Sequence, residues 1–250
     1  MKLIKLISLF SIIFFCSFFL FSPAIFPENL QFKEFLNSSC QADVLIIFNS
    51  GGWGNTPLED AKDFTPIIKG IQETLQKLGI NSEILPYQRT KNCFLGKITS
   101  AKDTFWSFRN QSENLAKEIK EFLRKNPQKK IVIAGLSNGA AFVDETMGKL
   151  AKETEDKVFA IEVGLPFWKK ALNSENILRL DNEGKDTFSK GEIKTLIYSL
   201  FKAPFLWVSA QISGEQIAFP QAFQAPGHQY FWDTAEVSLR VVSFLEDKIR

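Results

Sequence analysis

The chain has 250 residues, of which 45% are apolar and 23% are charged, so it is long enough to bury a large hydrophobic core. Its formal net charge of +2 comes from acidic and basic residues that are interspersed along the whole chain. The sequence has no long block of charges of one sign, and it lacks the basic residues interleaved with aromatic ones that suit nucleic-acid binding. No nucleic-acid partner is therefore expected. We expect one globular domain behind a leader.

The leader is residues 1–27. It carries Lys2 and Lys5 and then no charge before Glu28, which is typical of a secretory signal peptide or an N-terminal membrane anchor. A small-x-small cleavage site ends at Ala24, yet the uncharged span also meets the ~20 residues that a membrane-spanning helix needs. Removal and retention of the leader therefore both stay open. In either case the lysines predict a cytoplasmic N-terminus and a periplasmic or extracellular domain, tethered to the membrane if the leader is retained.

After the leader we expect a connecting segment, residues 28–42, and a single domain, residues 43–250. Short apolar runs in this domain alternate with segments whose apolar residues recur at helical spacing. The predicted strands are 42–50, 80–88, 130–135, 157–163, 176–181 and a less regular one within 215–223, and the predicted helices are 58–79, 112–126, 138–153, 190–203 and from Asp233 onward. The alternation predicts an α/β fold, with a mostly parallel sheet and helices on both faces.

Two cysteines follow the leader, Cys40 and Cys93. An oxidising compartment would permit a disulfide between them. However, Cys40 precedes one predicted strand and Cys93 follows the next, which places them at opposite edges of a parallel sheet and beyond the ~7 Å Cα limit of a disulfide. The sequence therefore favours two separate thiols.

A serine lies between two glycines in the segment Gly-Leu-Ser-Asn-Gly, directly after a predicted strand and before a predicted helix. Functional groups of parallel sheets gather outside the carboxyl ends of the strands, and Ser137 lies at such an end. A tight strand-to-helix turn needs glycine on both sides because the neighbouring backbones approach too closely for a Cβ. Gly135 and Gly139 meet this need. The pattern favours a nucleophilic Ser137 over a small residue in an ordinary turn.

A serine nucleophile needs a base that removes its proton, and imidazole is the usual choice because its pKa lies near neutrality. The chain has one histidine, His228, in a predicted loop between the last strand and the last helix. A lone loop histidine is often only a solvated side chain. Its place after the final strand nevertheless favours the role of base.

The elbow segment and the His228 loop resemble the α/β-hydrolase family, whose elbow reads Gly-x-Ser-x-Gly and whose triad runs serine, acid, histidine along the chain. The resemblance extends over about residues 43–250 and is specific at these two places. It implies a compact fold with little or no cap domain, with Ser137 as the nucleophile and His228 as the base.

The third triad member should be a carboxylate on the loop after the strand that follows the next crossover. That loop offers Asp181, Glu183 and Asp186. The family's habit of placing the acid shortly after a glycine favours Asp186, with Asp181 as the alternative. Glu183 and, after the preceding strand, Glu162 stay as further candidates, and any one of these acids could simply face water.

Acyl transfer also needs two backbone N–H groups that bind the oxyanion. The residue after the nucleophile, Asn138, supplies the first. The segment Asn-Ser-Gly-Gly-Trp-Gly-Asn resembles the family's glycine-rich oxyanion loop, although Ser50 or Gly51 stands where a histidine is often found. Gly52 or Trp53 is expected to supply the second N–H. As a phosphate-binding turn, this segment would lack the lysine and the spacing of a P-loop.

Loops predicted at the same rim carry the aromatic residues Phe105, Trp106, Phe108, Phe167 and Trp168. They could line an acyl or aryl pocket, but cover for the core beneath the loops is the favoured interpretation. Likewise, the apolar helix 190–203 is interpreted as a crossover helix that packs on the sheet rather than as a lipase-type lid. One histidine and separated cysteines do not build a usual zinc site, so neither metal nor cofactor is expected.

These features lead to the hypothesis of an exported serine hydrolase that cleaves small-molecule or lipid-like carboxylic esters with an apolar acyl or aryl portion. Thioesterase or amidase activity would use the same residues. A hypothesis of another class is a binding protein that has the fold but no activity.

Overall fold

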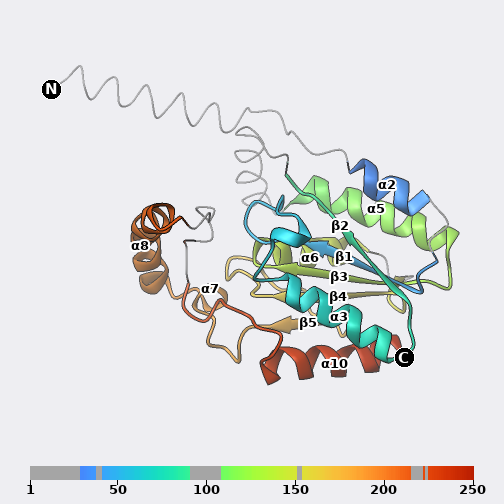
Figure 1. Ribbon diagram of the computed structural model, residues 1–250. Coiled ribbons are helices and arrows are strands. Elements are labelled where there is room, and N and C mark those ends of the chain that lie inside the picture. Colours follow the sequence, from blue (N-terminus) through green and yellow to red (C-terminus); the bar gives the residue numbers. More distant parts are fainter. Residues whose placement is uncertain (1–28, 38–40, 91–107, 151–153, 215–221, 223–224) are drawn as a thin grey trace, which may run out of the picture.

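The computed structural model describes residues 29–37, 41–90, 108–150, 154–214, 222 and 225–250. At its centre lies a five-stranded sheet with the strand order β2-β1-β3-β4-β5, in which all neighbours are parallel (Figure 1). The strands are β1 (Val44–Asn49), β2 (Ser82–Pro86), β3 (Lys130–Leu136), β4 (Val158–Val163) and β5 (Ile177–Leu180). The predicted α/β fold with a parallel sheet is confirmed.

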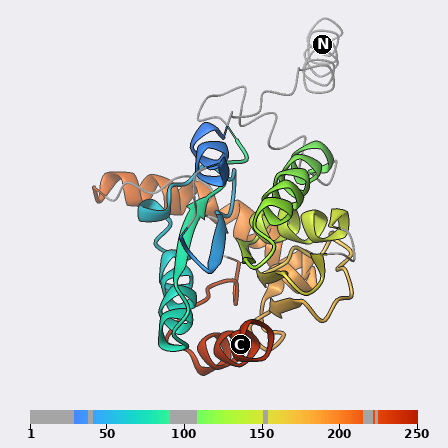
Figure 2. The ribbon, with the colours of Figure 1, turned by 90° about the vertical axis from the view of Figure 1, so that its right-hand side faces the viewer.

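Helices cover both faces of the sheet (Figure 2). Among the described residues, the helices are α2 (Leu30–Asn37), the 3-10 helix η1 (Leu58–Asp60), α3 (Thr65–Lys77), α5 (Arg109–Lys125), α6 (Asn138–Lys149), α7 (Thr187–Lys190), α8 (Ile193–Ile212) and α10 (Ala235–Ile249), and those on the sheet are α3 and α10 on one face and α5 and α6 on the other. Alternate residues of β1 point to opposite faces: Ile46 packs with the core under α3 and α10, and Ile47 with the core under α5 and α6. Burial on both faces explains why this strand is a continuous apolar run.

Two helices differ from the prediction near the start of the domain. The helix expected from residue 58 begins at Thr65, after the short turn η1, because Pro66 lacks an N–H and fits the first turn of a helix. Helix α2 lies inside the expected connecting segment and was not predicted. Its Phe32 and Leu36 are buried in the same core as α5. Helix α2 therefore packs against the domain although it lies in the expected connecting segment.

Helix α8 departs most from the prediction. It does not stop before Pro204 but continues to Ile212. The proline removes one backbone hydrogen bond, and the carbonyl left without its partner lies on an exposed helix where water can solvate it. Nor does α8 pack on the sheet as a crossover helix: its large apolar side chains are exposed, and its neighbouring element is α7.

Several predicted features lie outside the described residues: the leader, Cys40, Cys93, Phe105, Trp106 and nearly all of the strand within 215–223. Within the described part of the chain, no helix combines the length and the apolar character needed to cross a bilayer.

Candidate active site

Ser137 occupies the turn between β3 and α6 in a strained backbone conformation, with φ 54° and ψ −119°. Residues other than glycine rarely adopt a positive φ, and such strain persists only where the surrounding structure enforces it. The Ser137 amide donates a 2.8 Å hydrogen bond to the carbonyl of Val163 at the end of β4. Its hydroxyl does not cap α6. The turn therefore leaves the hydroxyl available at the edge of the sheet.

The two flanking glycines allow this turn to close. A Cβ on Gly135 would lie 2.4 Å from the carbonyl oxygen of Gly139, and a Cβ on Gly139 would lie 2.5 Å from the carbonyl oxygen of Asn49. Real Cβ atoms do not approach backbone oxygens so closely. The spacing of glycine, serine and glycine thus has the steric basis that the sequence indicated.

His228 and Asp186 form a hydrogen-bonded pair, with 2.8 Å between Nδ1 and Oδ2. The carboxylate is fully buried and lies at the N-cap of α7, where Oδ1 accepts hydrogen bonds from the amides of Phe188 and Ser189. Oδ2 also accepts from the hydroxyls of Tyr230, at 2.6 Å, and Ser189, at 2.9 Å. A proton on Nδ1 would leave Nε2 of the imidazole as the basic nitrogen.

The hydrogen bonds decide the charge state of this carboxyl group. Burial by itself raises the pKa of Asp186, but the hydrogen bond and charge of His228, together with the hydroxyls of Tyr230 and Ser189, hold that pKa below its usual value. Burial and the neighbouring carboxylate of Asp186 raise the pKa of Tyr230, so its hydroxyl stays protonated and can donate. Asp186 is therefore an anion in the folded protein near neutral pH.

The imidazole lies over the end of the strand next to Ser137. Gly164 directly follows β4, and a Cβ there would lie 2.6 Å from Cε1 of His228. Because Val163, the preceding residue, holds the amide of Ser137, the serine and the histidine lie at the ends of adjacent strands. Adjacent strands are about 4.8 Å apart. The structure thus brings Ser137, His228 and Asp186 to one edge of the sheet.

The alternative acids lie elsewhere. Asp181 is exposed, and its backbone carbonyl accepts a hydrogen bond from the amide of Asp186. Glu183 is exposed and pairs with Lys185 at 2.8 Å. Glu162 is buried and pairs with Arg179 on β5. Of the four candidates that the sequence offered, Asp186 is the one whose carboxylate contacts His228.

The loops that carry the acid and the base are tied to each other. Thr187 donates to the carbonyl of Pro226 through its amide at 3.1 Å and its hydroxyl at 2.8 Å. The side chain of Asn182 donates to the carbonyl of Gly227 at 2.9 Å. Gly227 has φ 78°, and a Cβ there would lie 2.1 Å from the carbonyl oxygen of Lys185. Close backbone packing at this glycine fixes the position of His228.

The glycine-rich loop after β1 lies beside the start of α6. The Asn138 side chain donates to the carbonyl of Gly52 at 3.3 Å, so the two segments with the expected oxyanion donors are in contact. Gly52 adopts φ 54°, which permits the tight turn around Trp53. The amide of Gly54 closes this turn on the carbonyl of Gly51 at 3.0 Å. Neighbouring backbone N–H groups on a rigid turn suit the binding of an oxyanion.

Arg89 holds this loop, although no motif in the sequence marks it for that role. Its guanidinium is buried, donates to the carbonyl of Ser50 at 2.7 Å and lies over the rings of Phe108 and Phe142. A Cβ on Gly54 would lie 2.5 Å from the guanidinium carbon. Only the position of Arg89 just after a predicted strand could have drawn attention to it. No sequence pattern indicated that Tyr230, two residues after His228, would contact Asp186.

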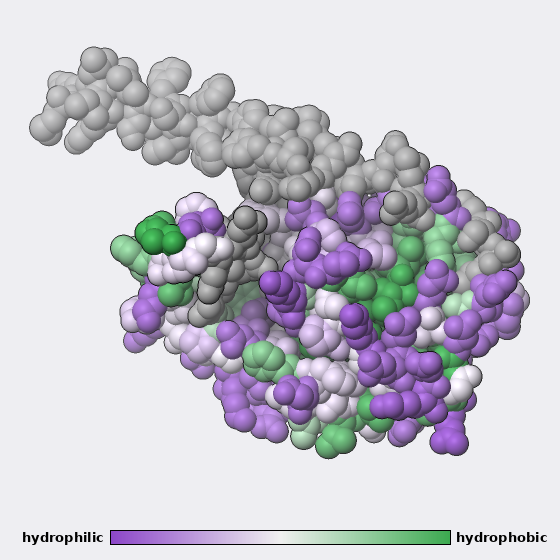
Figure 3. All heavy atoms as spheres, viewed as in Figure 1, coloured by the Kyte–Doolittle hydropathy of each residue, from purple (hydrophilic) through white to green (hydrophobic). Residues whose placement is uncertain are grey.

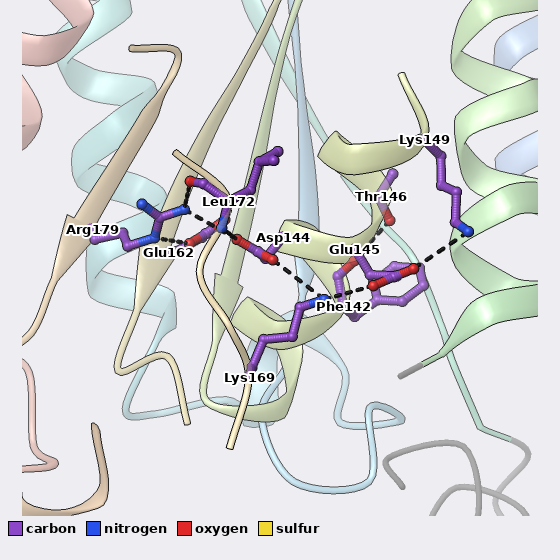
Figure 4. Close-up of polar contacts among 9 residues, drawn as sticks. All are labelled: Phe142, Asp144, Glu145, Thr146, Lys149, Glu162, Lys169, Leu172 and Arg179. Atoms are coloured by element: carbon purple, nitrogen blue, oxygen red, sulfur yellow. Dashed lines mark hydrogen bonds and ion pairs between the residues drawn. The ribbon is translucent and has the colours of Figure 1, made fainter. Parts of the chain in front are cut away.

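A network of ion pairs lies behind the elbow and joins α6 to β4 and β5 (Figure 4). Arg179 Nε lies 2.8 Å from the carboxylate of Glu162 and Nη2 lies 3.1 Å from that of Asp144. Lys169 bridges Asp144, at 3.4 Å, and Glu145, at 2.6 Å. The network anchors the helix that begins at the elbow.

The aromatic residues of the rim fall into two groups. Phe108 is buried against Phe142 and covers the core, as the sequence favoured. Phe167 and Trp168 are 42% and 47% exposed and continue, ring to ring, through Phe188 to the imidazole of His228. The second group forms an apolar surface next to the histidine.

No protein-family model matches the chain, and neither does any curated protein. Among solved structures, the chain is similar to Trichoderma reesei cutinase in complex with a C11Y4 phosphonate inhibitor, with a TM-score of 0.54. The two are 16% identical, and the match covers 84% of this chain and 77% of the cutinase chain. Together with the parallel sheet, this likeness shows that the chain has an α/β-hydrolase-like fold. The resemblance seen in the sequence is thus confirmed at the level of the fold.

Proposed function

We propose that the protein is an exported serine hydrolase that cleaves carboxylic esters through an acyl-enzyme. The observation that carries the proposal is a strained serine beside the end of β4, where an imidazole is held by a buried carboxylate. Strain at a single non-glycine residue in such surroundings is typical of functional sites. The structurally similar protein is a cutinase whose structure contains a phosphonate inhibitor, which supports the same class of chemistry.

In the proposed reaction, Nε2 of His228 takes the proton from Ser137 Oγ as that oxygen bonds to the ester carbonyl carbon. Asp186 holds the proton on Nδ1 and stabilises the imidazolium. The imidazolium then gives its proton to the leaving alcohol, and the bond between the carbonyl carbon and the alcohol oxygen breaks. Water, activated by His228 in the same way, hydrolyses the acyl group from Ser137.

The negative charge on the carbonyl oxygen would be bound by the backbone N–H of Asn138 and by that of Gly52 or Trp53. The contact between Asn138 and the carbonyl of Gly52 supports this assignment because it holds the two segments together. Loss of one such donor typically costs about 100- to 1000-fold in kcat.

The substrate class is an ester with an apolar acyl or aryl portion, from a small molecule or a lipid. The exposed rings of Phe167 and Trp168, joined to His228 through Phe188, support this choice because they offer an apolar surface beside the reacting group. A panel of p-nitrophenyl esters with graded acyl chains tests it. We expect kcat/KM to rise with chain length, and a flat or falling series would contradict the apolar site.

A fluorophosphonate probe tests the nucleophile. We expect the wild type to be labelled and the Ser137→Ala variant to be unlabelled. Ser238→Ala is the matched control, because Ser238 is a partly exposed serine on α10 whose hydroxyl donates to the carbonyl of Thr234, the N-cap of the same helix. A folded wild type that resists the probe would contradict the proposal and favour a non-catalytic binding protein. Matched thioester and amide substrates then distinguish an esterase from a thioesterase or an amidase.

Export follows from the apolar, lysine-preceded leader. Digestion of intact cells with an external protease, after removal of any outer membrane, tests this. We expect the domain to be degraded while a cytoplasmic marker survives. Survival of both would contradict export.

A further inference from the structure

Helix α8 exposes its apolar side chains instead of burying them. Its buried residues lie on one narrow side and are mostly small: Leu196, Ser199, Ala203 and Ala210. On the opposite side, large apolar residues recur at intervals of three and four, so they share one face of the helix: Tyr198, Phe201, Phe205, Val208 and Ile212. Phe201, Phe205 and Ile212 are 73%, 78% and 83% exposed. We refer to these five residues as the outer face of α8.

The position of α8 leaves this face open. The helix stands apart from the sheet on the side of α7, and it extends beyond the body of the domain (Figures 1 and 2). The space-filling view shows hydrophobic side chains on the outward side of α8, and it also shows hydrophobic areas elsewhere on the same face of the molecule (Figure 3). A contiguous apolar face of this kind marks an interaction site rather than the chance exposure of single residues.

The charges of α8 indicate the partner. The helix contains two charged residues, Lys194 and Lys202, and no aspartate or glutamate. Nζ of Lys202 lies 4.8 Å from the ring of Tyr198 at the border of the outer face. Lysines that flank a face of aromatic and aliphatic side chains are typical of helices that lie in the headgroup region of an anionic bilayer. We propose that α8 is a membrane-surface helix whose outer face inserts among anionic lipids.

A second copy of the chain fits this face less well. Pairing the outer faces of two α8 helices would place Lys194 and Lys202 of both copies in or beside one buried interface. The helix has no carboxylate that could compensate these charges. An anionic lipid surface supplies the compensation along the whole helix. An anionic lipid surface can therefore bury the outer face and also pair with the two lysines.

Helix α8 is joined by a short connection to α7, which carries the candidate acid, so a membrane that binds α8 lies near the candidate active site. Only Gly191 and Glu192 separate α8 from α7, whose N-cap is Asp186. Phe167 packs against Gly191, where a Cβ would lie 2.8 Å from its ring. A lipid surface that holds α8 therefore also lies close to the rim with the exposed aromatic residues. A retained leader would tether the domain to the membrane beside which α8 lies, whereas a cleaved leader would release the domain after export across it.

Depth-dependent fluorescence quenching tests the proposal on the full chain. Phe205→Trp adds an indole on the outer face, and Leu239→Trp adds one at a comparably exposed apolar position on α10. Each variant is mixed with phosphatidylglycerol vesicles whose acyl chains are brominated, and the emission of the unsubstituted chain is subtracted. We expect the indole at 205 to shift to the blue and to be quenched, while the indole at 239 keeps its emission. If only the leader held the protein on the vesicles, the two indoles should show the same quenching.

The lysines provide a second measurement. Replacing both by glutamine, on the Phe205→Trp background, should weaken docking on phosphatidylglycerol by about 25-fold, because each lysine near an anionic surface contributes about fivefold. Docking on phosphatidylcholine should not change. Equal quenching at 205 and 239 would overturn the proposal. So would a blue shift of the 205 indole that grows with protein concentration in vesicle-free buffer, since a second copy would then cover the face.

Discussion

Asp186 and Glu162 are both fully buried carboxyl groups near the ends of neighbouring strands, and their pKa values are shifted in opposite directions from the usual value. Asp186 accepts hydrogen bonds from amides, hydroxyls and the imidazole, and its pKa lies below its usual value in spite of burial. For Glu162, burial and the nearby carboxylate of Asp144 raise the pKa to about 8, and Arg179 offsets only part of this.

The difference shows that donors rather than burial decide the charge of an interior acid. Within the described residues, Oε1 of Glu162 has no hydrogen-bond donor, and Oε2 has the guanidinium of Arg179. Both oxygens of Asp186 have donors. A carboxylate that receives several hydrogen bonds is stabilised as an anion, whereas a buried one with few donors favours the proton. The first arrangement suits catalysis, and the second suits a structural role.

The largest expected effect follows from Asp186→Asn. Asparagine also caps helices, so α7 and the fold should survive. It cannot hold the imidazole of His228 in the tautomer that leaves Nε2 basic, and kcat should fall by about 10⁴-fold. Ester hydrolysis under saturating substrate measures this, with circular dichroism as the check on folding. The control is Asp181→Asn, at the exposed acid of the same loop. If Asp181→Asn removed activity and Asp186→Asn did not, the assignment of the acid would be wrong.

Arg179→Met should have the next largest effect, on stability. It leaves Glu162 and Asp144, which are 0% and 2% exposed, without their shared guanidinium. Breaking a buried ion pair by removing one partner typically costs about 3–5 kcal/mol of the free energy of unfolding, and at neutral pH this applies to the pair with Asp144, because Glu162, with a pKa of about 8, is largely protonated there. Urea unfolding at neutral pH measures the loss. Lys33→Met breaks a 4.0 Å surface pair with Glu118 and should cost less than about 1 kcal/mol. Equal losses in the two variants would show that the network does not stabilise the elbow helix.

The sequence was sufficient for features that depend on local chain geometry. The parallel sheet followed from apolar runs alternating with amphipathic segments, because burial on both faces removes polar residues from the strands. The glycines around Ser137 followed from the steric demands of a tight turn, which the structure shows directly. The uniqueness of His228 restricted the choice of base to one residue.

Features that depend on distant partners could not be predicted. Arg179 meets Asp144 across 35 residues and Arg89 meets Ser50 across 39, and no local pattern marks such pairs. The interpretation of helix 190–203 as a crossover helix that packs on the sheet was wrong. The spacing of its apolar residues showed that one face of the helix is apolar, but it did not show whether that face points toward the sheet. Helical periodicity identifies an apolar stripe, but only the tertiary structure tells whether the stripe faces the core or the exterior.

Tyr230→Phe should have a smaller effect, which depends on pH. The variant loses the 2.6 Å hydrogen bond to Asp186, and hydrogen bonds to charged groups contribute about 1.5–3 kcal/mol. The pKa of Asp186 should move up toward its usual value, so less of the stability that exists above the unfolded-state pKa remains. Urea unfolding should therefore show a larger loss at about pH 7 than at about pH 3. The exposed Tyr198→Phe serves as control, and a loss that is equal at both pH values would contradict the ionic role of Asp186.

Glu162→Gln should have a small effect on stability at neutral pH. It tests directly whether Glu162 and Asp186 differ in the pH dependence that they give to stability. Because burial raises the pKa of Glu162 from 4.5 to about 8, the native state holds a proton there that the unfolded state releases, and stability should fall as pH rises through this window. Glutamine cannot ionise, so the variant should lose this dependence while it keeps an acceptor for Arg179. Thermal unfolding across the window measures the difference.

Glu145→Gln, in the same network, should act with the opposite sign. Burial alone raises the pKa of Glu145, but hydrogen bonds and charges from Lys169 and Lys149 outweigh it and lower that pKa. Its contribution to stability is therefore present above the unfolded-state pKa and is lost as pH falls, so the glutamine variant should be less stable than the parent at neutral pH and should approach it in acid. If both variants changed the pH profile in the same direction, burial alone would govern these acids, and the distinction between Asp186 and Glu162 would lose its physical basis.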